Sequence, residues 1–242
     1  MDQLAGKKIL IFQQRSWGND LGHFLAKKFQ SLNCELAAMT SKKSTHKFTS
    51  EQTEVKYSQI ISVDDIYEYP EKYLGDDKIT FEQICGELKI DTLWPLIYSD
   101  RLLVRSYREK FYYSYRQNVS DEFIALFIKA YYKVARDLLK SFKPDLIIIP
   151  AFIHEGHIIL ELLGKQYGIP VISVENSKVP GWSIFVSDHL ISKCEMLDRA
   201  DELNNRLAES ANQAKAKQFI SRFREKFIRQ LAGVPADDMD LV

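Results

Sequence analysis

The sequence predicts an α/β protein in which helices cover both faces of a parallel sheet, giving three layers. Two short apolar runs support this prediction, ILIF at 9–12 and DLIIIP at 145–150, because the strands of a parallel sheet are buried on both faces. Each run is followed by a polar loop, by apolar residues at helical spacing and by another strand-like run. This order is typical of a βαβ unit, so the sheet is expected to contain two of them.

The first βαβ unit continues from ILIF through a polar loop into a helix. Apolar residues recur at helical spacing between Leu21 and Leu32, and Asn19 or Asp20 is the expected N-cap of that helix. The run CELAAM then provides a second strand. Residues 40–54 are polar throughout and are expected to form a mobile surface loop before a third strand, QIISV.

The second βαβ unit follows a long helical insertion, residues 64–142, which shows almost no strand character. Its apolar spacing predicts three helices, near 79–89, 99–117 and 121–141. Pro144 ends the last helix because proline cannot continue one. After DLIIIP, a helix near 156–167 and the strand VISVEN complete the unit.

The chain is expected to divide into a sheet domain and a helical extension. Residues 1–195 contain every predicted strand together with the insertion, as one Rossmann-like domain. Residues 196–242 contain a long charged helix or helix pair, from about Leu197 to Leu231, with sparse apolar positions.

The composition excludes several classes of protein. The 242 residues include 33 lysines and arginines and 33 aspartates and glutamates, so the chain has no net positive charge that would attract nucleic acid. Three widely spaced cysteines match neither a disulfide framework nor a zinc pattern, and they suit a reducing cytosol. No signal peptide opens the chain, and its apolar runs are too short to span a bilayer. The expected location is cytoplasmic.

Three loops are expected to form a ligand site at one edge of the sheet. Ligands of parallel sheets bind at the carboxyl ends of the strands, where loops meet helix N-termini. The loops at 13–20, 151–156 and 175–183 each follow a predicted strand. We therefore expect these three loops to lie along a common rim.

The loop after DLIIIP contains the densest group of proton-handling side chains, His154-Glu155-Gly156-His157. A zinc protease motif needs histidines four apart, as in H-E-x-x-H, so this spacing argues against a metal and none is expected. One interpretation makes His154 or Glu155 a general base, with His157 contacting substrate. The other makes His154 and Glu155 a helix cap that favours the positive end of the helix dipole.

The first loop contains Arg15, Trp17 and Gly18, with His23 just inside the following helix. It lacks both the G-x-G-x-x-G and the GK[ST] signatures of phosphate-binding loops. A glycine beside a helix N-terminus can still leave backbone N–H groups free for an anion or a sugar hydroxyl. The alternative is a turn glycine followed by a surface histidine.

The third loop follows VISVEN and begins with Glu175 and Asn176. A carboxylate directly after a buried strand can contact a hydroxylated ligand or cap the next element. Trp182 could form one wall of a sugar site through its flat face, or cover the core.

Three arginines, Arg101, Arg105 and Arg108, fall on one face of the predicted helix near 99–117. Such a stripe can bind phosphate or carboxylate groups through paired hydrogen bonds. The alternative is a solvated face with local ion pairs. The aromatic residues between the arginines could also mark a surface that contacts a membrane or a partner.

The order of these elements resembles a known family. It comprises a W-G-x-x-x-G-H-F loop, an R-S-Y-R-E-x-F-Y-x-x-Y-R element, K-P-D-L-I-I-I-P and YGIPVISVENSKVPGWSIFVSD. Together they are similar to the N-terminal, acceptor-side domain of bacterial capsule and surface-polysaccharide glycosyltransferases. That resemblance implies a GT-B architecture, in which two Rossmann-like domains face each other and the C-terminal one binds the sugar nucleotide.

The resemblance implies acceptor binding rather than a complete transferase. Residue 242 falls before a second Rossmann-like domain could be completed, which leaves three alternatives. The chain is a fragment of a longer protein whose further domain binds the donor, a partner subunit supplies the donor-binding half, or the protein is a stand-alone relative without full transferase activity. The expected ligand is a glycan or lipid-linked sugar acceptor, and a nucleotide-sugar donor is expected only with that second half. No other cofactor is expected, and peripheral contact with the inner membrane face is a further expectation. The alternative function is a non-catalytic binding or scaffold module that docks a partner or a membrane surface.

Overall fold

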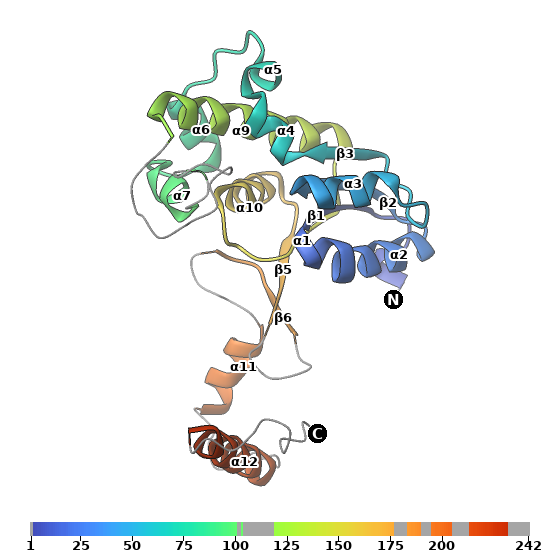
Figure 1. Ribbon diagram of the computed structural model, residues 1–242, viewed down its shortest axis with the longest axis vertical. Coiled ribbons are helices and arrows are strands. Elements are labelled where there is room, and N and C mark those ends of the chain that lie inside the picture. The colour runs from blue at the N-terminus through green and yellow to red at the C-terminus, as the bar shows by residue number, and fades with distance from the viewer. Residues whose placement is uncertain are drawn as a thin grey trace. The chain divides into compact units, whose positions relative to one another are not determined.

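The structure is a computed structural model that describes residues 2–100, 103, 119–176, 183–189, 195–204 and 213–231. The chain forms two compact units, Met1–Cys194 and Glu195–Val242. Unit 1 contains the sheet (Figure 1). The described residues of unit 2 form the helices α11 (Glu195–Asn204) and α12 (Gln213–Leu231), so of the two predicted alternatives, one long helix or a helix pair, these residues have the pair.

Unit 1 is built on a six-stranded sheet with the strand order β3-β2-β1-β4-β5-β6. The strands are β1 (Lys8–Gln14), β2 (Glu35–Ser41), β3 (Gln59–Ser62), β4 (Leu146–Ile149), β5 (Val171–Asn176) and β6 (Ser183–Val186). The first five are parallel, and β6 pairs antiparallel with β5 at the edge. The order reverses beside β1, because the chain leaves through β3 on one side and returns through β4 on the other. The predicted Rossmann-like α/β fold is confirmed.

The apolar runs form strands because both of their faces are buried. Leu10 and Phe12 of β1 face one hydrophobic cluster, while Ile9 and Ile11 face the other. This alternation follows from the two-residue repeat of a strand. All four residues are fully buried, so the uninterrupted apolar pattern marks a strand with helices on both sides.

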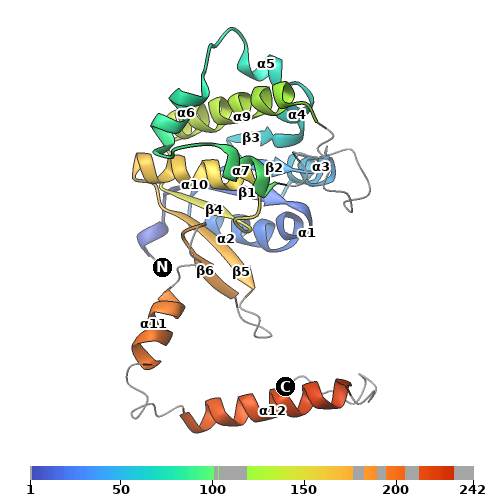
Figure 2. The same ribbon diagram turned by 90° about the vertical axis from the view of Figure 1, so that its left-hand side faces the viewer.

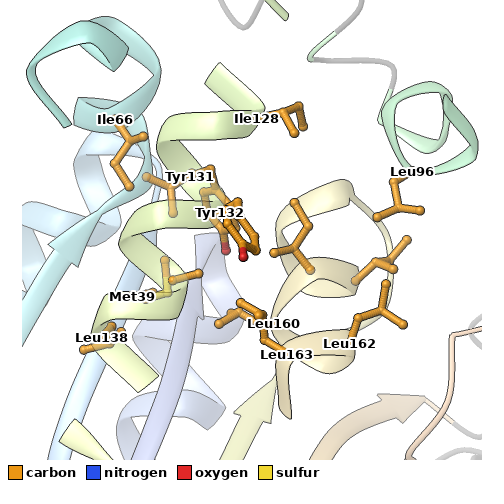
Figure 3. Packing of buried hydrophobic residues seen from close by; sticks show 14 of the residues in the cluster. Met39, Ile66, Leu96, Ile128, Tyr131, Tyr132, Leu138, Leu160, Leu162 and Leu163 are labelled. Atoms are coloured by element: carbon orange, nitrogen blue, oxygen red, sulfur yellow. The ribbon is translucent and has the colours of Figure 1, made fainter. Parts of the chain in front are cut away.

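Helices cover the two faces of the sheet unequally (Figures 1 and 2). Helix α2 (His23–Ser31) packs on one face through Ala26 and Phe29. On the other face lie α9 (Asp121–Phe142) and α10 (Glu155–Tyr167), whose apolar side chains form the larger cluster shown in Figure 3. The right-handed crossovers of the two βαβ units place α2 and α10 on opposite faces.

The insertion adds further helices to the side of α9 and α10. They are α4 (Val63–Glu68), α5 (Pro70–Leu74), α6 (Phe81–Leu88) and α7 (Trp94–Ser99). Thr80 forms a capping box with Gln83 at the start of α6, and Ser120 caps α9 by accepting a hydrogen bond from Phe123 N. The predicted helices near 79–89 and 121–141 are confirmed. The one near 99–117 falls almost entirely outside the described residues.

Three local predictions differ from the structure. Residues 40–54 include the helix α3 (Lys43–Glu51) rather than a loop, because its buried face is polar: Thr45 and Thr49 point inward. The helix after β1 begins at Arg15 as α1 (Arg15–Trp17), continues through the π-helical turn η2 (Gly18–Gly22) and runs into α2, so neither Asn19 nor Asp20 caps it. Strand β6 was not predicted, since an edge strand of four residues has little pattern of its own. A short 3-10 helix, η1 (Asp2–Leu4), precedes the sheet.

Candidate functional site

The carboxyl ends of β1 and β4 flank the point where the strand order reverses. The two strands are neighbours, with Leu10 beside Ile147, and β5 follows β4 in the same direction. The expected rim is therefore present at the loops that begin near 13 and 151. In such sheets the crevice at this point is the usual ligand position.

Several predicted site residues cannot be placed at this rim. Glu175 and Asn176 belong to β5 and pair with Ile184 and Ser183 of β6. Four others lie outside the described residues: Trp182, Arg101, Arg105 and Arg108. Their expected contacts with substrate stay predictions.

The H-E-G-H segment is buried at the rim. His154 is 6% exposed, Glu155 and His157 are fully buried, and Asp100 from the end of α7 is 3% exposed. Ligand atoms of Asp100, His154 and Glu155 lie within 4.8 Å of one another. The His154 and His157 rings stack with centroids 3.6 Å apart, and His157 meets the edge of Phe12. The insertion thus places the carboxyl group of Asp100 next to the two histidines and Glu155, which follow β4 of the sheet.

The side-chain polar atoms of His154, Glu155 and His157 lack a hydrogen-bond partner among the described residues, whereas Asp100 Oδ1 accepts a hydrogen bond from Leu103 N. Within the described part of the chain, neither imidazole nitrogen of His154 makes a hydrogen bond, and no donor satisfies either carboxyl oxygen of Glu155. The gap from His154 Nδ1 to Glu155 Oε2 is 3.9 Å, too long for a hydrogen bond. Buried polar groups are normally paired, so unpaired ones at this position indicate a bound polar ligand or water.

The helix-capping interpretation is only partly met. His154 occupies the N-cap position of α10, but its side chain accepts no hydrogen bond from the helix. Glu155 lies in the first turn, where an ionised carboxylate would favour the helix dipole. The pKa of Glu155 is instead raised well above its usual value, by burial and by the neighbouring Asp100 carboxyl. A protonated Glu155 contributes little as a charged cap.

Burial also keeps the histidines neutral. The pKa of His154 falls from 6.5 to about 4 because burial disfavours the imidazolium, although Asp100 opposes the shift. The pKa of His157 is also lowered, by burial and by the adjacent His154. At neutral pH the site therefore offers uncharged imidazoles, which can accept a proton, next to a carboxyl group whose raised pKa favours its protonated form.

Two cations follow neighbouring strands at the same rim. Gln14 of β1 pairs with Ser41 of β2, so Arg15 and Lys42 are the next residues of strands about 4.8 Å apart. Both have positive φ, +50° for Arg15 and +85° for Lys42, a conformation that costs energy for residues other than glycine. Burial and the Arg15 charge lower the pKa of Lys42, whereas Asp64 raises it. Residues held in strained backbone conformations often occur at functional sites, and here both strained residues are cations.

A pocket with both polar and apolar lining residues opens at the carboxyl ends of β2 and β3, next to Lys42. Its volume is about 720 Å³, within the usual range for small-molecule sites. Its lining includes Lys43, His46, Ser62, Asp64, Asp65, Glu68, Tyr69 and Tyr73. Lys42 interacts electrostatically with Asp64 of this pocket and with Asp100 of the buried cluster. The pocket combines carboxylates with tyrosine rings, which suits a hydroxylated ligand.

The glycines of the first loop serve packing. A Cβ on Gly22 would lie 2.0 Å from Gln13 Oε1, and one on Gly18 would lie 3.0 Å from the Gln13 backbone. The N–H of Gly18 donates to the Arg15 carbonyl, so it is not free for an anion, contrary to the interpretation of this loop as an anion site.

The two aromatic side chains of the first loop and helix also contact the protein itself. Trp17 packs in the cluster under α2. His23 Nε2 lies 2.8 Å from Glu54 Oε2, so this histidine already has a protein partner.

A second buried carboxylate lies two turns further along α10. Glu161 is fully buried, and its carboxylate forms ion pairs with Lys165 and with His189, whose Nδ1 is 2.5 Å from Glu161 Oε2. Lys165 also lies 3.1 Å from Asp188. Glu161 Oε2 therefore has His189 as a hydrogen-bond partner, and Oε1 lies against the Lys165 ammonium as an ion pair without hydrogen-bond geometry.

Two groups of described residues have enough ligand atoms for a metal ion, Asp100-His154-Glu155 and Glu161-Asp188-His189. In the second group the Lys165 ammonium already neutralises the carboxylates. In the first, the charges of Arg15 and Lys42 act on the same site and oppose a cation. The donor sets therefore give little support to a resident metal.

Sequence reasoning missed three residues of these sites: Lys42, Asp100 and Glu161. The sequence did contain a signal for Lys42: it directly follows a strand of the first βαβ unit, which is a position at the rim of the sheet. Asp100 had none, since it reaches the rim only through the folding of the insertion.

No protein-family model matches the chain, and no curated protein matches its sequence. Among the described helices, none is both long enough and apolar enough to cross a bilayer. Because one fold can host many activities, the chemistry of the site decides which function is proposed.

Proposed function

We propose that unit 1 is the acceptor-binding half of a GT-B-like glycosyltransferase that assembles surface polysaccharide in the cytoplasm. The observation that supports this proposal most directly is the buried, unpartnered His154 beside a protonated Glu155 at the reversal of strand order. A site of this kind binds a polar ligand and offers it a proton acceptor.

His154 is the better candidate for the base. Its imidazole is neutral, whereas Glu155 holds its proton and cannot take another from a hydroxyl. In the proposed reaction, the acceptor hydroxyl gives its proton to His154 while its oxygen forms the bond to the anomeric carbon. The bond from that carbon to the nucleoside diphosphate breaks, and the diphosphate leaves with the electron pair. Asp100 would stabilise the imidazolium that forms, because its charge raises the pKa of His154.

Arg15 and Lys42 favour an anionic acceptor, such as an acidic sugar or a lipid-linked sugar phosphate. Both cations lower the pKa of His154 in the free protein. An acceptor anion bound between them would offset their charge and raise that pKa toward neutrality, where a general base is most effective. The pocket beside Lys42 would hold the sugar ring, with Tyr69 as a 53% exposed apolar wall.

The nucleotide-sugar donor would be bound by a second domain or a partner subunit. The first loop of unit 1 has its glycines packed against β1, and the N–H of Gly18 is already bonded. A phosphate cradle of the kind used for sugar nucleotides is therefore not provided by this loop. We expect the 242-residue chain alone to show no thermal stabilisation by nucleotide sugars.

The test is an NMR titration of the imidazole resonances in the ¹⁵N-labelled chain. We expect the pKa of His154 to be about 4 in the free protein. It should rise by about one unit or more with N-acetylglucosamine 1-phosphate or glucuronic acid, because an anion stabilises the imidazolium. Neutral glucose should have less effect, and His23, paired with Glu54, should not respond.

A matched pair of variants assigns the anion site. Lys42→Gln should weaken binding of the anionic sugars by tenfold or more, on the order of the loss of one charge-assisted contact. Lys47→Gln removes an exposed lysine of α3 and should leave binding unchanged. Equal binding by both variants, or a His154 resonance that no sugar affects, would contradict the proposal.

A further inference from the structure

Helix α12 has one apolar face bordered by positive charge on both sides. At 3.6 residues per turn, Phe219, Ile220, Phe223, Phe227 and Leu231 fall within an arc of about 120°. Lys217 and Arg224 lie at one border of this arc, and Lys215 and Lys226 lie at the other. The helix is therefore amphipathic with a cationic margin.

The apolar face is open to solvent where the structure describes its side chains. Phe219 is 52% exposed, Ile220 46% and Phe223 60%. Residues 213–225 are all exposed, so no described part of unit 2 covers this face. Large apolar side chains that recur on one exposed face are unusual for a surface helix and indicate a contact that buries them.

The charge of α12 differs from that of the chain. Lysines and arginines number six in the helix against one glutamate, whereas the chain as a whole has a formal net charge of zero. We propose that α12 binds the surface of an anionic lipid membrane, lying in the plane of the interface. Its phenylalanines would enter the boundary between headgroups and acyl chains, and its lysines and arginines would reach the phosphates.

Charge complementarity favours a lipid surface over a second copy of the helix. Pairing two copies through this face would bring two strongly cationic margins together, and like charges repel. An anionic bilayer supplies both an apolar interior for the phenylalanines and negative charge at both margins at once. The long stems of lysine and arginine can cross the apolar boundary while their charged ends stay in water.

The experiment is co-sedimentation of the full 242-residue chain with lipid vesicles. Vesicles of phosphatidylcholine with about a quarter phosphatidylglycerol should bind the chain, and pure phosphatidylcholine should bind it far less. Binding should fall as NaCl rises from 0.05 to 0.5 M, because salt screens exposed charges. Circular dichroism should show added helix only with the anionic vesicles if α12 becomes more ordered on binding.

Two variants separate the apolar and charged contributions. Arg222→Gln with Arg224→Gln should lower the partition coefficient roughly 25-fold, at about fivefold per charge. Lys47→Gln with Lys78→Gln removes the same charge from exposed positions of unit 1 and should have no effect. Phe219→Ser with Phe223→Ser should abolish binding, while the thermal unfolding of unit 1 stays unchanged.

Three outcomes would overturn the proposal. They are equal binding to neutral and anionic vesicles, binding that both α12 variants retain, and no binding at 0.05 M NaCl. A dimer that is lost in the Phe219→Ser, Phe223→Ser variant, without vesicle binding by the wild-type chain, would instead assign the face to a second copy. None of these results depends on the sugar titration of unit 1.

Discussion

Helix α10 contains two fully buried glutamates, and their surroundings differ completely. Glu161 has an ammonium and an imidazole as ion partners, Lys165 and His189. Glu155, two turns earlier, faces another carboxyl group, Asp100, and a histidine with no hydrogen bond. Burying a charge is costly unless it is paired, so burial and the Asp100 carboxyl raise the pKa of Glu155, whereas Glu161 has the Lys165 ammonium beside it.

The difference separates a structural site from a ligand site. A buried charge whose partners all come from the protein stabilises the packing of the elements that supply them, here α10 and the segment after β6. A buried polar group left unpaired destabilises the fold, and it persists where a ligand uses it. Burial alone would class both glutamates together, whereas their partners distinguish them.

The largest expected effect is that of removing the paired carboxylate. Glu161→Gln keeps the size of the side chain but removes the anion that His189 contacts and leaves Lys165 with Asp188 alone. We expect the free energy of unfolding to fall by about 2 to 3 kcal/mol, the range for a hydrogen-bonded charged group. Urea denaturation at pH 7 measures this loss. A change below about 0.5 kcal/mol would show that the ion pairs of Glu161 do not stabilise the fold.

A smaller effect is expected from pH at the unpaired site. Below pH 6.5 the unfolded chain protonates His154, but the folded protein does not until about pH 4. The unfolded state therefore binds more protons in this window, and stability falls as the pH falls. Between pH 7 and pH 5 this histidine should cost about 2 kcal/mol.

The control for the pH effect is His154→Gln, which cannot be protonated. The variant should lose less stability than the wild type between pH 7 and pH 5, by about the amount assigned to His154. His157 remains in both proteins, and burial, the larger cause of its lowered pKa, acts in both, while the variant removes the smaller contribution from His154. Parallel stability curves for the two proteins would mean that His154 titrates in the fold as it does in water.

The apolar strands and the two βαβ units could be predicted from the sequence because their signal is local. ILIF and the three isoleucines of DLIIIP, residues 147–149, are buried, so each of these residues reports the same environment. Helix α3 was missed because its inward side chains are Thr45 and Thr49, and Thr40 contacts His46 within the same segment. The sequence alone does not distinguish polar residues that hydrogen-bond one another inside the fold from polar residues that are exposed to water.

The candidate site could be predicted only in outline. The H-E-G-H group was found because its residues are adjacent in the chain, and the rim follows from the strand order. Asp100 comes from the insertion, some fifty residues before His154, and the strained conformation of Lys42 leaves no pattern in its side chain. Whether a buried glutamate is paired, as Glu161 is, depends on contacts such as that with His189, which only the tertiary structure supplies.

The smallest expected effect is that of Glu155→Gln, and its sign opposes that of Glu161→Gln. The pKa of Glu155 is higher in the folded protein than in the unfolded chain, so at pH 7 this carboxyl group destabilises the fold. Glutamine cannot ionise, and the variant should be as stable as the wild type or up to about 1 kcal/mol more stable. The gain should vanish near pH 4, where both states of the wild type are protonated. A loss of stability as large as that of Glu161→Gln would mean that Glu155 is paired in the folded protein after all, and the distinction between the two ends of α10 would fail.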